Sequence, residues 1–289
     1  MAFKSRYLMR RFLSTMAQPR PRRFAPLKET AAGQHLELPK LQGVIFDVDG
    51  TLCKPQNHMF TQMRAVLGIP KSIDILEHIY SLPTPSQQEA AMESIRAIER
   101  QSMREQIAQP GLTALMSYLD KRGVRKGICT RNFEQPVTHL LTKFLSGSVF
   151  HPVVTRDFRP PKPDPAGLLY IARSWGLVRR VEGPRDERIV HEVVHEKSDA
   201  SSAQEKEGAV GHHEVGDASG LIMVGDSIDD MTAGRRAGAA TVLLVNDANR
   251  HLADHEHTDL VIERLDELVH VLDHGFVGRE IPNNSDGNE

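Results

Sequence analysis

Two carboxylates, Asp47 and Asp49, stand two residues apart at the end of a short apolar run that begins at Val44. In an extended chain, side chains two residues apart point to the same side of a sheet. One carboxylate can therefore attack an electrophile while the other transfers protons. Gly50 allows a sharp turn after them, and Thr51 adds a hydroxyl and a backbone amide for binding an anion. The segment predicts paired acid chemistry at a strand end.

Three further strand ends carry polar groups that suit a phosphate site. A second apolar run ends in Asp226, and if its strand lies beside the first, Asp226 and Asp47 could share a hard cation such as Mg²⁺, which prefers oxygen ligands. Thr130 supplies a hydroxyl, and Lys162 supplies an ammonium group in a loop stiffened by prolines. Nucleophile, metal ligand, hydroxyl donor and cation are all present in the sequence.

The elements that must position these residues are five short apolar runs separated by helical patterns. The runs cover residues 44–48, 124–130, 149–155, 221–226 and 241–245. Such runs are typical of buried parallel strands, and ligands of open α/β sheets bind beyond the carboxyl ends of the strands. The alternation predicts an α/β fold with a Rossmann-like parallel sheet as its core domain. About 70 residues of largely helical pattern follow the first strand, which is too long for a simple crossover and predicts an inserted α-helical cap domain.

The expected domain boundaries follow from these elements. They are a basic N-terminal targeting segment and linker (1–40), an α/β core (41–53 and 124–275), a helical cap (54–123), a disordered insertion within the core (180–219) and a flexible C-terminal tail (276–289). The insertion is inferred from its charged and small residues, which show no core pattern. Its histidines, His191, His195 and the pair His212-His213, could bind a transition metal, but a solvated loop is the better interpretation because no Cys or fixed acidic partner accompanies them.

The overall charge of −2 conceals an asymmetry between the N-terminus and the rest of the chain. Residues 1–28 carry eight Lys or Arg and no acidic residue, so the remainder holds 28 basic and 38 acidic residues. An acidic body argues against nucleic acid as a partner. No stretch approaches the ~20 apolar residues needed to span a bilayer, which argues against membrane insertion. Two cysteines are too few for a disulfide framework. The sequence does not indicate an oligomeric state.

The basic N-terminus predicts targeting to the mitochondrial matrix. Its aromatic and leucine side chains can share one helix face opposite the basic residues, as in a transit peptide. A disordered basic tail is the alternative. Met16 offers a second start that would leave a cytoplasmic form.

With these motifs in this order, the chain resembles phosphatases of the haloacid dehalogenase (HAD) superfamily that carry a helical, C1-type cap after the first strand. The similarity is to the phosphoglycolate phosphatase and beta-phosphoglucomutase branch of subfamily I. It extends from about Leu41 to Asp273, without the insertion. The motifs that carry it are residues 47–51, Thr130, Lys162 and the pair Gly225-Asp226.

The resemblance implies a role for each matching residue. Asp47 would be the nucleophile that forms an aspartyl-phosphate, and Asp49 the acid that protonates the leaving oxygen and later activates water. Mg²⁺ would bind to the Asp47 carboxylate, the backbone carbonyl of Asp49 and the Asp226 carboxylate. Thr130 and Lys162 would hold the phosphoryl oxygens.

Residues next to these motifs complete the expected site. Asp229 or Asp230 would orient Lys162 or a water, and position favours Asp230. Many relatives follow the Thr or Ser of the second motif directly with Asn, whereas Arg131 here precedes Asn132. Arg131 could reach a charge on the substrate or lie solvated.

The implied function is Mg²⁺-dependent hydrolysis of a small phosphorylated metabolite. A sugar phosphomutase would use the same residues. A halogen-removing hydrolase fits less well because it needs neither Mg²⁺ nor a proton-donating Asp49. A non-catalytic phosphate-binding protein is the alternative from another class, although such proteins usually lose at least one of the carboxylates that this chain retains.

Overall fold

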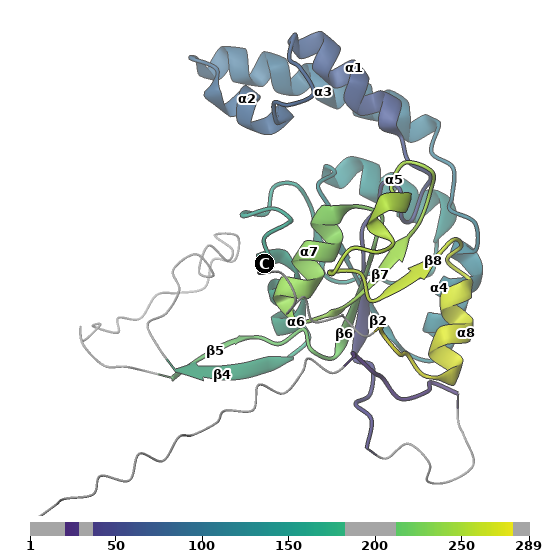
Figure 1. Cartoon of the computed structure of the whole chain (residues 1–289). Coiled ribbons are helices and arrows are strands. Elements are labelled where there is room, and N and C mark those ends of the chain that lie inside the picture. Colours follow the sequence, from purple (N-terminus) through teal and green to yellow (C-terminus); the bar gives the residue numbers. More distant parts are fainter. Residues whose placement is uncertain (1–20, 29–36, 183–211, 280–289) are drawn as a thin grey trace, which may run out of the picture.

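A six-stranded, fully parallel sheet forms the centre of the computed structural model, which describes residues 21–28, 37–182 and 212–279 (Figure 1). The order of its strands is β3-β2-β1-β6-β7-β8. Their bounds are β1 Gly43–Phe46, β2 Arg125–Cys129, β3 Val153–Val154, β6 Leu221–Gly225, β7 Ala240–Leu244 and β8 Leu260–Ile262. β1 lies between β2 and β6, so the predicted first and fourth strands are direct neighbours.

Helices cover both faces of this sheet. They are α4 Leu112–Lys121, α5 Glu134–Phe144, α6 Ala166–Ser174, α7 Ile228–Ala237 and α8 Glu267–His274. Along β1, Val44 and Phe46 pack with α4, α5 and α8, whereas Ile45 packs with α6 and α7. This alternation follows from the two-residue period of a strand, and the arrangement confirms the predicted α/β fold with a parallel sheet as its core.

Three helices, α1 Asn57–Leu67, α2 Ile75–Ser81 and α3 Pro85–Arg104, form the cap, a separate layer beyond the sheet (Figure 1). Their buried side chains form a cluster of their own, which includes Met63, Ile79 and Ile95. Thr84 begins α3 by accepting a hydrogen bond from the Gln87 amide, with Pro85 at the first helical position. No helix of the described residues is long and apolar enough to cross a membrane.

The end of the cap differs from the predicted boundary at residue 123. The apolar side chains of α4, including Leu115 and Leu119, belong to the cluster of the sheet rather than to that of the cap. The helical layer that packs apart from the sheet therefore consists of α1 to α3. The apolar period of α4 is the same whichever surface it covers, so the sequence pattern alone could not assign it.

Parts of the predicted linker and tail are packed on the core. Phe24 and Phe276 are both buried, and the Phe24 amide donates to the Phe276 carbonyl at 3.0 Å. A bridge between Arg23 and Val277 continues this pairing. The predictions of a linker that extends to residue 40 and of a flexible tail from residue 276 are therefore wrong at residues 22–28 and 276–279.

The prediction of a disordered insertion over residues 180–219 is wrong at its two ends, residues 180–182 and 212–219. β4 Val178–Glu182 and β5 His212–Gly216 form an antiparallel pair that projects from the core (Figure 1). Val215 and Ala218 are buried. His212 and His213 lie on β5, whereas His191 and His195 lie outside the described residues, as does the N-terminal segment 1–20 with its predicted targeting function.

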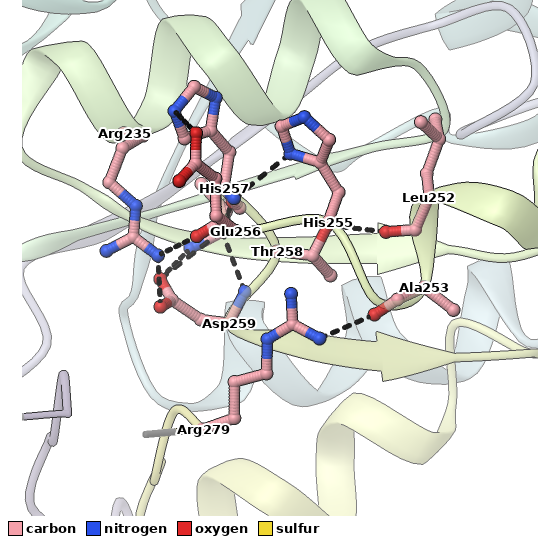
Figure 2. A network of polar contacts seen from close by, with 10 residues as sticks. Arg235, Leu252, Ala253, His255, Glu256, His257, Thr258, Asp259 and Arg279 are labelled. Carbon is pink, nitrogen blue, oxygen red and sulfur yellow. Dashed lines mark hydrogen bonds and ion pairs between the residues drawn. The ribbon is translucent and has the colours of Figure 1, made fainter. Parts of the chain in front are cut away.

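The sequence prediction missed β8, which has only three residues. A polar network holds its start in place (Figure 2). The buried Asp259 carboxylate accepts hydrogen bonds from Arg235 of α7 at 2.6 Å and from the Thr241 amide of β7 at 2.9 Å. The strand is thus anchored by side chains distant in sequence, which an apolar-run criterion does not detect.

Candidate active site

The nucleophile candidate, Asp47, directly follows β1 and is buried. Its amide donates to the Val224 carbonyl of β6 at 3.0 Å, which continues the strand pairing. The side chain of Asp47 accepts a hydrogen bond from the Lys162 ammonium at 2.7 Å, and the same ammonium donates to Asp230 at 2.5 Å. The structure thus brings together three residues that lie more than 60 positions apart in the sequence.

Lys162 is almost fully buried, so its charge depends on these carboxylates. Burial alone would lower the pKa of Lys162, but the charges of Asp230 and Asp47 outweigh burial and raise it. The ammonium group is therefore a fixed positive charge at the bottom of the site. Fixed charges of this kind stabilise the extra negative charge that develops on a phosphoryl group during transfer.

Asp230 is held from two sides. Ser227 begins α7 and forms a capping box with Asp230, whose Oδ2 accepts from the Ser227 amide at 3.0 Å and from the Ser227 hydroxyl at 2.6 Å. Its other oxygen accepts from Lys162. The helix start therefore fixes the acid that orients the lysine.

Asp226 directly follows β6 and lies close to the turn after Asp49. A Cβ atom added to Gly50 would lie 2.1 Å from Asp226 Oδ2, and Gly50 has φ +85°. Glycine is thus required at position 50 both for its backbone conformation and for the approach of this carboxylate. The backbone carbonyl of Asp226 is in turn fixed by Asn249 Nδ2 at 2.6 Å.

Asp47, Asp226 and Asp230 form the acidic cluster of this site, and one oxygen of each lies within 4.8 Å of the others. Burial and the nearby carboxylates raise the pKa of Asp226 to about 8. The single positive charge of Lys162 does not balance these three carboxylates, so an excess of negative charge remains buried in the site. Carboxylate oxygens at this spacing fit a divalent cation, which would offset that charge.

Asp49 lies beside this cluster in a different environment. Its Oδ1 accepts from the Gln56 amide at 3.1 Å and is 3.9 Å from the Cys53 sulfur. Burial and the charge of Asp47 raise the pKa of Asp49 to about 7. A carboxyl group with such a pKa can donate and accept protons near neutral pH, as general acid–base catalysis requires.

The remaining predicted residues lie around this edge. Thr130 follows β2 and is buried, and its hydroxyl accepts from the Asn132 amide at 3.2 Å. Arg131 extends toward α7 and pairs with Asp229 at 2.9 Å. The Thr51 amide donates to the Val48 carbonyl and so is not available to an anion, whereas its buried hydroxyl has no partner among the described residues.

Residues that the sequence prediction missed connect the cap to the core. Arg156, which follows β3, pairs with Glu99 of α3 at 3.3 Å and stacks on Phe133 with its guanidinium carbon 4.0 Å from the ring centre. Gln56 Nε2 donates to the Ser102 carbonyl at 2.8 Å. Arg156 and Gln56 lie in loop segments without a motif or a regular period, so no local signal identified them.

Comparison with known proteins decides the family. A family model described as haloacid dehalogenase-like hydrolase matches residues 41–238, which contain all the residues of the acidic cluster and Lys162. This chain is a haloacid dehalogenase-like hydrolase. It is similar to an uncharacterized hydrolase of Saccharomyces cerevisiae, with 39% identity over 81% of this chain and 92% of that protein. A haloacid dehalogenase-like hydrolase domain-containing protein of Arabidopsis thaliana is 30% identical over 82% of this chain and 86% of its own length.

Solved structures show the same fold for this HAD-like hydrolase. A putative phosphoglycolate phosphatase from Lactobacillus plantarum superposes with a TM-score of 0.55 at 17% identity, covering 80% of this chain and 99% of that one. A hydrolase from Pseudomonas syringae superposes with a TM-score of 0.54 at 22% identity, covering 80% and 98%. At these identities the likeness establishes the α/β core with its helical insert and leaves the substrate open.

Proposed function

We propose that this HAD-like hydrolase is a Mg²⁺-dependent phosphatase that transfers the phosphoryl group of a small ester to Asp47 and then to water. The observation that carries the proposal is the buried cluster of Asp47, Asp226 and Asp230, in which Asp47 and Asp230 also bind the Lys162 ammonium. The Asp47 carboxylate and the phosphate of the substrate are both negatively charged and repel each other. The phosphate can approach Asp47 only if positive charge is supplied from both sides of the site. Lys162 supplies one charge, and the carboxylate oxygens fit a cation that would supply the other.

The Mg²⁺ site would consist of the Asp47 and Asp226 carboxylates and the backbone carbonyl of Asp49. Asp230 already accepts from Lys162 and Ser227, so its part is to position the lysine. Bound Mg²⁺ would neutralise phosphoryl oxygens and draw the substrate toward Asp47. The fit rests on the buried excess of carboxylates, because Lys162 binds two of the three acids and adds a single positive charge.

In the first step, a carboxylate oxygen of Asp47 forms a bond to phosphorus while the ester oxygen leaves. Asp49, protonated near neutral pH, gives its proton to that oxygen, so the product departs as a neutral alcohol. In the second step Asp49, now ionised, takes a proton from water, which attacks phosphorus and restores Asp47. Lys162 and the Thr130 hydroxyl bind phosphoryl oxygens in both steps.

Replacement of Asp47 by Asn tests the proposal. The amide keeps the size of the side chain but removes the nucleophile, so turnover of para-nitrophenyl phosphate with Mg²⁺ should fall to background while the circular dichroism spectrum is unchanged. EDTA should abolish wild-type turnover, and Mg²⁺ should restore it. Undiminished turnover by Asp47→Asn, or turnover in EDTA, would overturn the assignment.

A further inference from the structure

A cavity of about 790 Å³ lies between the cap and the core. Its cap wall is formed by α1 and the segment that leads into α2, and its core wall by the loops after β2, β3 and β7. On the core side, Arg131 directly follows Thr130, and Ala248 precedes Asn249, which binds the Asp226 carbonyl. The cavity therefore borders the edge of the sheet that carries the candidate catalytic groups.

The side chains around this cavity are strongly cationic. The charged ones are Arg64, Lys71, Arg131, Arg156 and a single acid, Asp74. Asp74 Oδ1 accepts hydrogen bonds from two backbone amides at the start of α2. This single carboxylate balances one of the four positive charges, so the lining keeps an excess of three.

Two of the four cations have acidic partners and two do not. Arg131 pairs with Asp229, and Arg156 pairs with Glu99. No acidic partner for Arg64 or Lys71 is found among the residues that the structure describes. Both unpaired cations belong to the cap wall of the cavity, Arg64 on α1 and Lys71 between α1 and α2.

Arg64 also has an unsatisfied donor. Its Nε is buried and has no hydrogen-bond partner in the described part of the chain, and its Nη1 makes only a long contact of 3.4 Å with the Phe60 carbonyl. A buried charged donor without a partner is costly, whereas an anion would satisfy it. The guanidinium group thus points to an anionic ligand.

We propose that this cavity binds a second anionic group of the substrate, held by Arg64 and Lys71 from the cap and by Arg131 from the core. The proposal rests on the proposed function and specifies its substrate class: a phosphate monoester with a carboxylate or a second phosphate on a short carbon chain. Apolar side chains of the lining would contact the chain itself, namely Phe60, Ile69, Ile75 and Leu76. Because both domains hold the same anion, such a substrate stabilises the arrangement in which the cap covers the site.

Three matched compounds test this: phosphooxypropanoate, its carboxamide, and propanediol bisphosphate. The carboxamide keeps the phosphate but lacks a second anionic group. We expect the full-length protein with Mg²⁺ to show kcat/KM at least about tenfold higher for a doubly anionic compound than for the amide, the effect of a charge-assisted hydrogen bond. Comparing the carboxylate with the bisphosphate identifies which second anion is preferred. Arg64→Gln and Lys71→Gln should each reduce this preference severalfold, and together remove it.

Arg100→Gln is the matched control, since Arg100 lies on the cap helix α3, is exposed and pairs with Glu93 at 2.6 Å. It should keep the full preference. Equal kcat/KM for the amide and for both compounds with a second anionic group overturns the subsite while the phosphatase assignment stands. An undiminished preference in the Arg64→Gln/Lys71→Gln variant does the same. Tm shifts with the same compounds provide a readout without turnover. If no ester is hydrolysed, the proposed function fails. The subsite is then supported if the two compounds with a second anionic group raise Tm more than the amide does, and overturned if they do not.

Discussion

The buried pair of Glu99 and Arg156 makes a quantitative prediction about pH and stability. The Glu99 side chain is 4% exposed and that of Arg156 is 6% exposed, with 3.3 Å between the nearest nitrogen and oxygen. Yet neither of these two atoms has a hydrogen bond, so the contact lacks the alignment that a strong ion pair needs. Burial therefore outweighs the attraction of Arg156, and the pKa of Glu99 rises from 4.5 to about 7.

The sign of the effect follows from this direction. A carboxyl group whose pKa is higher in the folded state favours folding fully below its unfolded pKa, and this contribution is lost as the pH rises through the folded value. For values of 4.5 and about 7, the free energy of unfolding should fall by about 2.5 kcal/mol between about pH 5 and about pH 8. Glutamine does not titrate, so Glu99→Gln removes this dependence whatever its effect at a single pH.

Urea unfolding of wild type and Glu99→Gln, followed by circular dichroism at both pH values, measures the difference. The variant should gain about 2.5 kcal/mol relative to wild type on going from the lower to the higher pH. Glu93→Gln is the control on the same helix. Both side chains of the Glu93–Arg100 pair are exposed, so the pair contributes little to the free energy of unfolding. A stability difference between Glu99→Gln and wild type that is the same at both pH values would refute the reasoning that burial dominates this pair.

Two further predictions concern the catalytic edge. Asp49→Asn should lower kcat for para-nitrophenyl phosphate about 100- to 10,000-fold at saturating Mg²⁺, because the group that exchanges protons near neutral pH is lost; an unchanged kcat would exclude Asp49 from proton transfer. Gly50→Ala should lower stability by about 1–3 kcal/mol and weaken Mg²⁺ activation, because the new Cβ lies 2.1 Å from Asp226 Oδ2 at φ +85°. Gly68→Ala is its control in urea unfolding and Mg²⁺ titration, since Gly68 has φ +66° but open space around it; equal Mg²⁺ activation in both variants would contradict the role of Gly50.

The core could be predicted from sequence because its signals are local. A buried parallel strand appears in the sequence as a continuous apolar run. The acids follow directly after it, as Asp47 does after β1 and Asp226 does after β6. Neighbouring strands then bring such ends together without further information. Even the pairing of Lys162 with Asp230 follows from this geometry, because the loop after β3 and the first turn of α7 meet at one edge.

What could not be predicted depends on contacts between distant segments. α4 has the period of any amphipathic helix, and only its packing shows that it covers the sheet. Phe24 lies in a stretch rich in proline and arginine, but it is buried because it packs against Phe276 from the far end of the sequence. A short charged or proline-rich segment can be ordered by one aromatic contact, which composition does not reveal.

The same distinction explains why the sequence indicates the reaction more clearly than the reactant. Asp47 and Asp226 are placed by backbone pairing of adjacent strands, which tolerates few alternatives. Arg64 and Lys71 are placed by the cap, whose packed side chains form a cluster separate from that of the core. The cations of a cap can therefore change without disturbing the sheet. The unpaired charges of this cap are explained by the second anionic group that we propose for the substrate.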